Sequence, residues 1–277
     1  MPTVTYDMRR TQERFERLTE YVQRARIGPD GFECERLSEC NESLPLDLRP
    51  LRPENRGGLI HVGEEFDVSV GGRALRILFV GKDYGGGNSD LEARRRCIQG
   101  LAERDLNWHY KGVVKTLLEL YQCRQEDGWR PLLARMAQTN ATRCCAPRDG
   151  RMRCNMNYGS RLSCWPHFRA EIEILEPTLM IFHGSDLRYP FNECLRRERV
   201  EARQVLPGVE RCQLIRWTNF RRPFESVIVF MNHPAAAPWH RFDWTNGAEI
   251  INRLRPIHLP VFNHQWTPLQ REDWPRL

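Results

Sequence analysis

The amino-acid sequence predicts an α/β domain in which a central, mostly parallel sheet is covered by helices on both faces, a three-layer α/β/α arrangement. Short apolar segments rich in β-branched and aromatic residues alternate with amphipathic segments of helical period. This alternation is typical of parallel strands joined by helical crossovers. The chain has 277 residues, 40% hydrophobic and 28% charged, which is enough to bury one large core. This length suits one large α/β domain or two small ones, and we expect a single domain.

Three parts are expected along that domain. They are an N-terminal helix and cysteine-bearing segment, an α/β core, and a short C-terminal tail, over residues 1–58, 59–255 and 256–277. The first helix is expected over residues 6–27, because apolar side chains fall on one face and arginines and glutamates on the other. The segment after it is rich in turn-forming residues and is expected to be irregular.

The core elements follow from the hydrophobic pattern. Short strands are expected over residues 59–62, 66–70, 75–80 and 179–182, and in the stretches RCQLIRWTN and SVIVFMNHP. Helices are expected over residues 89–104, 107–122 and 243–254, and in the stretch that starts at HFRAEIEIL. Pro177 separates that last helix from the strand after it. RMAQTNATRCCAP runs from a further helix or short strand into a polar loop.

The charge is compatible with a nucleic-acid partner. The net charge is +6, and 39 of the 42 basic residues are arginine, which binds phosphate in a bidentate fork. A genome bias toward arginine would give the same count, so this support is weak. No apolar run reaches the length of a membrane span, and the first residues lack the apolar centre of a signal peptide. We expect a cytoplasmic monomer with no membrane partner.

Ten cysteines indicate a metal or cluster site. In a cytoplasmic chain a disulfide framework is improbable, so thiolate ligation is the better interpretation for the cysteines in polar or irregular stretches. The remaining cysteines occupy ordinary helix or strand positions, where cysteine acts as a small apolar residue.

A glycine-rich loop follows one of the buried strands, in RILFVGKDYGGGNSD (residues 76–90). The glycines either form a flexible connection or let a ligand approach the backbone at the carboxyl end of a strand, where open α/β sheets bind ligands. Two further loops follow apolar segments, over residues 139–145 and 232–240. Together the three loops would bring Asp83, Asn140 and His233 to one edge of the sheet. Singly, these residues could instead be a helix cap, a turn residue and a structural histidine.

Four stretches resemble the uracil-DNA glycosylase superfamily, most closely its iron–sulfur members, families four and five. They are GKDYG (81–85), TNATRCCAP (139–147), CWPHFRAEIEILEPTLMIFHG (164–184) and HPAAAPW (233–239). The resemblance covers roughly residues 30–255, and the order and spacing of the motifs are more specific than any one of them.

The resemblance implies a [4Fe–4S] cluster that fastens the DNA-contacting loops. Its ligands would be Cys34, Cys40, Cys144 and Cys164, with Cys145 or Cys154 as substitutes for the third. The family has two cysteines close together at the first pair, whereas five residues separate them here. Zinc is the competing ion.

The resemblance also implies an enzyme that flips a pyrimidine nucleotide out of DNA and hydrolyses its N-glycosidic bond, leaving an abasic site. Asn140 would pair with the edge of the base and Tyr110 would stack on it, unless Tyr110 is a core aromatic at a helix start. His233 would donate a hydrogen bond to the departing base, and Asp83 or Asn88 would orient the attacking water. Further contacts to the base and to DNA would come from Lys82, Tyr84, Gly85, Pro238, Trp239 and Arg241.

The base itself stays open between uracil and a C5-modified cytosine. Gly85 stands where family-one enzymes have the tyrosine that abuts C5 of the pyrimidine, so the glycines would leave space there. A glucosylated hydroxymethylcytosine of phage DNA would fit that space and would imply anti-phage defence rather than DNA repair. The alternative function is a non-catalytic nucleic-acid-binding module that keeps a structural cluster. A third alternative, a cluster-bearing redox or structural protein, ranks last because it leaves the placement of Asn140 and His233 unexplained.

Overall fold

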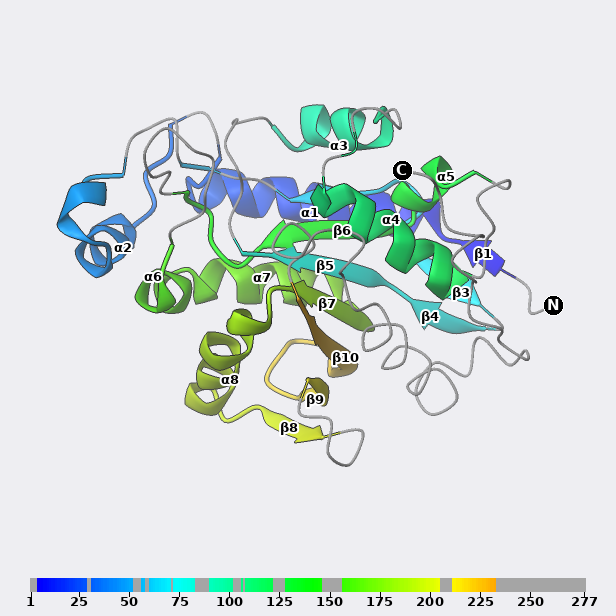
Figure 1. The fold of residues 1–277 in the computed structure, drawn as a ribbon. Coiled ribbons are helices and arrows are strands. Elements are labelled where there is room, and N and C mark those ends of the chain that lie inside the picture. The colour runs from blue at the N-terminus through cyan, green and yellow to red at the C-terminus, as the bar shows by residue number, and fades with distance from the viewer. Residues whose placement is uncertain are drawn as a thin grey trace.

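The computed structural model describes residues 4–28, 31–51, 56–57, 60–70, 72–82, 90–101, 106, 108–121, 128–145, 156–204 and 211–232 (Figure 1). The helices are α1 (Met8–Arg24), α2 (Leu37–Ser43), α3 (Leu91–Gln99), α4 (Trp108–Tyr121), α5 (Arg130–Leu133), α6 (Tyr158–Ser163), α7 (Trp165–Leu175) and α8 (Arg188–Arg197). The strands are β1 (Val4–Tyr6), β2 (His61–Val62), β3 (Val68–Val70), β4 (Arg73–Leu75), β5 (Ile77–Gly81), β6 (Met136–Asn140), β7 (Leu179–His183), β8 (Glu201–Gln204), β9 (Cys212–Trp217) and β10 (Phe224–Met231).

A mixed α/β fold is thereby confirmed, with a seven-stranded sheet in the order β2-β6-β5-β7-β10-β9-β8. Its four central strands, β6, β5, β7 and β10, are parallel to their neighbours within the group. The strands at both edges, β2, β9 and β8, pair antiparallel. The short connection over residues 218–223 explains this on one side, because it joins β9 to β10 as a hairpin and a hairpin reverses the chain.

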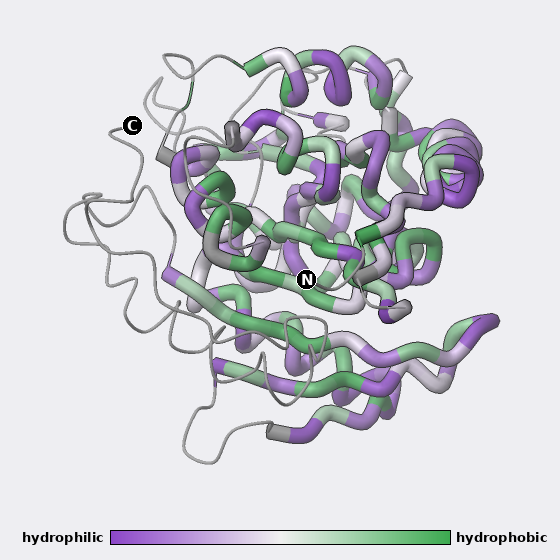
Figure 2. The backbone as a smooth tube through the Cα atoms, turned by 90° about the vertical axis from the view of Figure 1, so that its right-hand side faces the viewer, coloured by the Kyte–Doolittle hydropathy of each residue, from purple (hydrophilic) through white to green (hydrophobic). Residues whose placement is uncertain are grey.

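Central strand β5 is buried on both faces, and its side chains alternate between two hydrophobic clusters. Ile77 and Phe79 pack into a cluster that contains α4, whereas Leu78 and Val80 pack into a second cluster that contains α1 and α7. A strand buried on both sides reads as a continuous apolar run, which is why the sequence reveals it so clearly. Figure 2 shows hydrophobic residues along the central strands and hydrophilic ones on the outer sides of the helices.

Helix α1 is fastened to the rest of the molecule by buried charges. Asp7 caps it by accepting a hydrogen bond from the Arg10 N–H. One helical turn on, the buried Arg14 forms ion pairs with Asp67 (3.0 Å) and Glu176 (2.8 Å). A small antiparallel sheet, β1-β3-β4, lies beside the same helix end, with β3 following directly after Asp67.

Several sequence expectations are confirmed with shorter bounds, and some elements were missed. The first helix begins at Met8 rather than at residue 6, and the helix expected over 89–104 is α3. The break at Pro177 is confirmed, because α7 ends at Leu175 and Glu176 adopts a left-handed conformation. The sequence did not predict β1, α2, β4, α6, α8 or β8, and a polar loop up to about Cys164 was expected where α6 lies. The helix expected over 243–254 lies outside the described residues. In the described part, no helix combines the length and apolar character that crossing a membrane requires.

Candidate functional site

The residues predicted to form a site divide into two groups. Lys82, Tyr110, Asn140 and the four expected cysteine ligands belong to the described part of the chain. Outside the described residues lie Asp83, Tyr84, Gly85, Asn88, Cys154, His233, Pro238, Trp239 and Arg241. The described part of the predicted site consists of the strand ends and the segments that carry the cysteines.

Asn140 ends β6 at the carboxyl edge of the parallel strands, and its side chain lies against Gly81 of the neighbouring strand. The two residues are register partners, and the Ala141 N–H donates to the Gly81 carbonyl oxygen (2.9 Å). A Cβ atom added to Gly81 would stand 2.4 Å from Asn140 Oδ1, so any larger residue at position 81 would force the Asn140 amide to move. Glycine at position 81 therefore leaves the space in which the Asn140 amide lies.

Lys82 continues β5 and forms an ion pair at the end of the next strand. Its Nζ lies 2.8 Å from Asp186 Oδ1, and Arg161 lies 3.2 Å from the other oxygen of the same carboxylate. Burial alone would raise the pKa of Asp186, but the hydrogen bond from Lys82 and the charge of Arg161 lower it below its usual value. The structure thus places the Lys82 ammonium group against Asp186.

Tyr110 lies in the first turn of α4 and belongs to the hydrophobic core. Its side chain is 7% exposed and packs in the cluster that contains β5 and β6. The hydroxyl accepts a hydrogen bond from Arg94 (3.2 Å), and burial raises the pKa of Tyr110. Of the two roles that the sequence allowed for Tyr110, stacking on a base or packing in the core at a helix start, this position matches the second.

A polar group that sequence reasoning missed lies beside Tyr110. Gln138 Nε2 is 2.9 Å from His109 Nε2, and the His109 ring meets the His183 ring edge to face at 5.1 Å. Gln138 is two residues before Asn140 and shares its side of β6, while His183 ends β7. The sequence feature that could have indicated this polar group is the histidine that ends the apolar strand in MIFHG.

A buried ion pair holds the backbone at the end of β6. Arg143 and Glu171 are each 1% exposed, and Arg143 Nη2 lies 3.0 Å from Glu171 Oε2. The same guanidinium donates to the Asn140 carbonyl oxygen (2.7 Å) and to Thr139 Oγ1 (2.5 Å), and Thr139 donates to Glu171 (2.6 Å). Burial raises the pKa of Glu171, and the charge of Arg143 opposes that rise.

The same arginine connects the strand end to the cysteines. The Arg143 N–H donates to Cys164 Sγ (3.3 Å), and the Cys40 thiol donates a hydrogen bond to the same sulfur. These two hydrogen bonds lower the pKa of Cys164, the bond from Cys40 having the larger effect. Burial raises the pKa of Cys34 and of Cys144, and a charge on Cys164 raises each further.

Each of the four expected cysteine ligands is shielded from water. None is more than 9% exposed, and Cys145 is buried as well. They come from segments far apart in sequence: Cys34 precedes α2, Cys40 lies in α2, Cys144 follows β6 and Cys164 lies between α6 and α7. In the part of the chain that the structure describes, no group of histidine, cysteine, aspartate or glutamate side chains already has the geometry of a metal site.

Hydrogen bonds fix the segments around these thiols. Helices α2 and α6 lie side by side (Figure 1), and Ser43 Oγ is 2.7 Å from Ser160 Oγ across their contact. Asn157 caps α6 through Ser160 and also donates to the Ser43 carbonyl oxygen. The sequence described the segment around α2 as irregular, because a helix of seven residues among turn-forming residues has no clear apolar period.

A histidine and a tyrosine extend the thiol group, and sequence reasoning did not single out either. His167 Nε2 lies 3.2 Å from Cys34 Sγ, and its Nδ1 lies 2.8 Å from the Tyr21 hydroxyl. Burial, with the charges of Arg143 and Arg36, lowers the pKa of His167 to about 4. The ring is therefore neutral at physiological pH and can donate one N–H, to the sulfur or to the phenol oxygen.

Comparison with known proteins assigns no family. No protein-family model matches the chain. A partial similarity exists to Dachshund homolog dac-1 of Caenorhabditis elegans, 33% identical over 75 residues. That similarity covers 24% of this chain and 18% of the relative.

The buried ion pair gives the first prediction. Replacing Arg143 with methionine should lower the free energy of unfolding by about 3–5 kcal/mol, because Glu171 is left charged and unpaired in the interior. Adding Glu171→Met to the same chain should recover about half of that loss, because no buried charge then remains. Urea unfolding of the two single variants and the double variant measures both the loss of unfolding free energy and its partial recovery. Losses that simply add would show that the two side chains do not interact.

Proposed function

We propose that the chain is a DNA glycosylase of the uracil-DNA glycosylase type, which flips a pyrimidine nucleotide out of DNA and hydrolyses its N-glycosidic bond to leave an abasic site. The observation that carries this proposal is the position of Asn140. Its side-chain amide lies at the carboxyl end of a central parallel strand, against Gly81, and Arg143 holds its backbone carbonyl oxygen. Open α/β sheets bind their ligands at this edge.

A fixed amide suits the recognition of a flipped pyrimidine. It offers one acceptor and two donors, which can pair with the edge of uracil, or with cytosine if the amide is turned over. The base edge is inaccessible inside a duplex, so the nucleotide has to leave the stack to reach Asn140. Holding the strand end with a buried ion pair supports this role, because a recognition group must keep its position to discriminate.

Two further groups are proposed for the chemistry. The proposal is supported by their places in the sequence and by the positions at which the strands before them end. Asp83 follows the end of β5 by two residues, and His233 follows the end of β10 by two residues. Both strands run parallel to β7 and so end at the same edge as Asn140. His233 would donate to the O2 atom of the departing base, where negative charge develops, and Asp83 or Asn88 would orient water and offset the positive charge on the sugar.

We further propose that Cys34, Cys40, Cys144 and Cys164 hold a [4Fe–4S] cluster, with zinc as the competing ion. Four buried thiols, one of which accepts a backbone N–H, are the donor set that such a cluster uses. When bound, the cluster would cross-link the segment before α2, helix α2, the loop after β6 and the α6–α7 junction. The link from Cys164 through Arg143 to Asn140 means that this cross-link would also steady the base-recognition residue.

The three-layer arrangement belongs to the same proposal. The two hydrophobic clusters that receive alternate side chains of β5 support it, since each cluster packs helices against one face of the sheet. A DNA-binding surface would then lie over the loops at the carboxyl edge, including Pro238, Trp239 and Arg241, with Tyr84 and Lys82 beside the base.

The base is proposed to be uracil or a C5-modified cytosine. Gly85, in the place of the family-one tyrosine, leaves no side chain beside C5, so a glucosylated hydroxymethylcytosine of phage DNA is admitted along with uracil. An enzyme acting on that base would serve anti-phage defence.

A non-catalytic nucleic-acid-binding module is the second candidate, and one observation favours it. Tyr110, the residue expected to stack on the flipped base, is packed in the core with its hydroxyl bonded to Arg94. A module that only binds DNA needs no stacking partner for an extruded base, whereas a glycosylase would have to find one elsewhere or shift α4.

Cleavage of labelled DNA separates the two candidates. Oligonucleotides carrying uracil, cytosine or a glucosylated hydroxymethylcytosine are incubated with the protein, single-stranded and double-stranded, and abasic sites are broken with alkali. The wild-type protein should cleave at one of these bases. Asn140→Ala and His233→Ala should each lower the single-turnover rate by about 100- to 1,000-fold, and Gly81→Ala should do so by displacing the Asn140 amide.

The matched control is Asn219→Ala, an exposed asparagine at the opposite end of the sheet, which should keep the full rate. Absence of strand breaks with every base, together with retained DNA binding, would favour the binding module. A full rate in Asn140→Ala would contradict the base-recognition role.

The cluster makes a separate prediction about metal content. Protein purified without oxygen should be yellow-brown and contain about four iron atoms per chain. Cys164→Ala should lose the colour, whereas Cys212→Ala, a buried cysteine in β9, should keep it. A colourless protein with stoichiometric zinc would show that the site binds zinc rather than a cluster. If Cys164→Ala keeps its full content of iron or zinc, Cys164 is not a ligand.

A further inference from the structure

A pocket of about 280 Å³ lies at the end of the sheet opposite to Asn140. It is lined by Arg10, Glu13, Arg14, Arg17, Glu173, Glu176, Arg221 and Arg222. Glu176 lies just before β7, and the two last arginines lie in the turn that leads into β10. Because β7 and β10 run parallel, these positions mark their amino ends. Five residues of β7 span about 16 Å at about 3.3 Å per residue, so this pocket is separate from the proposed base site.

The carboxylates of the pocket are already occupied. Glu176 accepts from Arg14 (2.8 Å) and from Arg10 (3.2 Å). Glu13 pairs with Arg9 (3.2 Å), which is not among the residues that line the pocket. Glu173 accepts the Arg221 backbone N–H (3.3 Å) and lies 3.7 Å from Arg169.

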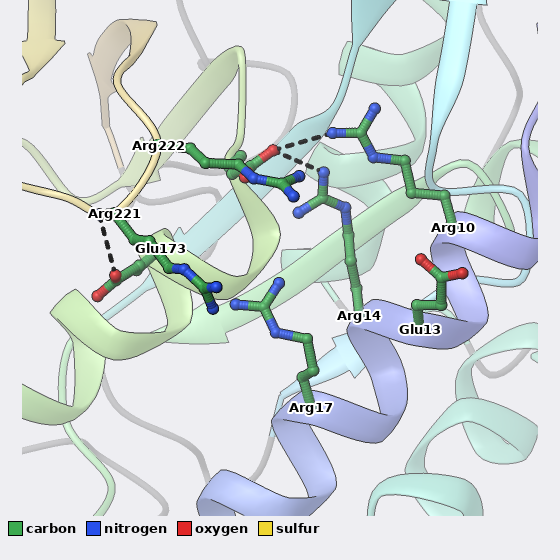
Figure 3. Close-up of a pocket in the computed structure, with 8 residues that line it drawn as sticks. Arg10, Glu13, Arg14, Arg17, Glu173, Arg221 and Arg222 are labelled. Carbon is green, nitrogen blue, oxygen red and sulfur yellow. Dashed lines mark hydrogen bonds and ion pairs between the residues drawn. The ribbon is translucent and has the colours of Figure 1, made fainter.

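Three of the pocket's arginines, unlike its carboxylates, have no partner of opposite charge among the described residues. Within the described residues, the side chains of Arg17, Arg221 and Arg222 form no ion pair and no hydrogen bond. Figure 3 shows the guanidinium ends of Arg17 and Arg221 pointing toward one another, and that of Arg222 pointing toward the end of Arg14. Like charges that converge without an intervening carboxylate repel one another, and an anion between them relieves that repulsion.

Arg14 gives the pocket a fixed wall. Its side chain is buried, with ion pairs to Asp67 and Glu176 and a hydrogen bond to the Ile174 carbonyl oxygen. A guanidinium held in this way is a rigid part of the pocket lining, and its own charge is balanced by the two carboxylates, so the uncompensated charge comes from Arg17, Arg221 and Arg222. The three exposed arginines would then close over an anion from two sides, one from α1 and two from the β9–β10 turn.

We infer that this arginine pocket binds a small, free phosphate-bearing ligand. Guanidinium groups match the geometry of phosphate oxygens in bidentate hydrogen bonds, which favours phosphate over a simple monovalent anion. The volume is just below the range of about 300–1,000 Å³ usual for small-molecule sites, so it suits a compound with one or two phosphate groups and little else. The inference does not rest on glycosylase activity.

Calorimetric titration of the full chain with inorganic pyrophosphate at low ionic strength tests this inference. The wild-type protein should bind it saturably, and Arg17→Ala with Arg222→Ala in one chain should weaken binding by about tenfold or more. A double variant with lysine at both positions should lie between, because lysine keeps the charge but loses the fork. The control is Arg24→Ala with Arg203→Ala, which removes two exposed arginines outside the pocket and should change binding by less than about twofold.

Three results would overturn the inference. They are no saturable binding up to about 10 mM pyrophosphate, an equal loss in the control pair, and no loss in the Arg17 and Arg222 pair. The titration is then repeated with a saturating short DNA duplex present. Unchanged pyrophosphate affinity supports a free ligand, whereas displacement by DNA would assign the pocket to the phosphate backbone of DNA and overturn the free-ligand assignment.

Discussion

Arg143 and Glu171 carry opposite charges in the interior of the protein, and the position of the candidate site depends on their contact. Neither charge could remain there alone, because the cost of removing an ion from water is recovered only by a well-placed partner. The guanidinium satisfies its remaining hydrogen bonds with the backbone oxygen of Asn140 and with Thr139, and the Arg143 backbone reaches Cys164. The ion pair thus joins a strand end, helix α7 and the group of thiols.

This arrangement explains why the proposed cluster can be remote from the chemistry and still matter for it. The thiols come from four segments, and one hydrogen bond leads from Cys164 to the residue that holds the end of β6. On the other side of the strand, Gly81 supplies the space for the Asn140 amide. Base recognition would therefore depend on two features: Gly81 on β5, which leaves space for the Asn140 amide, and the buried Arg143, which holds the backbone at the end of β6.

The sequence could predict β5, β7 and β10, because short apolar runs rich in β-branched and aromatic residues are typical of strands buried on both faces. It left the segment before Asn140 open between a helix and a short strand and placed Asn140 in the loop after it, whereas the structure ends β6 at Asn140. The grouping of Cys34, Cys40, Cys144 and Cys164 came from the resemblance rather than from spacing, and it stays a prediction. The sequence could not predict the pairing of Arg143 with Glu171, which are 28 residues apart, because Glu171 in sequence looks like any acidic residue of an amphipathic helix. The arginine pocket is likewise a product of tertiary packing, which local patterns do not record, whereas a core position for Tyr110 was one of the two interpretations that the sequence allowed.

Hydrogen–deuterium exchange of the wild-type protein and the Cys164→Ala variant tests most directly whether the thiols steady the strand end. Peptides covering residues 136–145 and 156–165 report the two regions, and a peptide from β10 serves as the internal reference. If the thiols steady the strand end, exchange is faster in both regions of the variant, including the Ala141 amide that donates to Gly81, and β10 is unchanged. Faster exchange confined to residues 156–165 would contradict it, because the cysteines and the Asn140 strand end would then be independent.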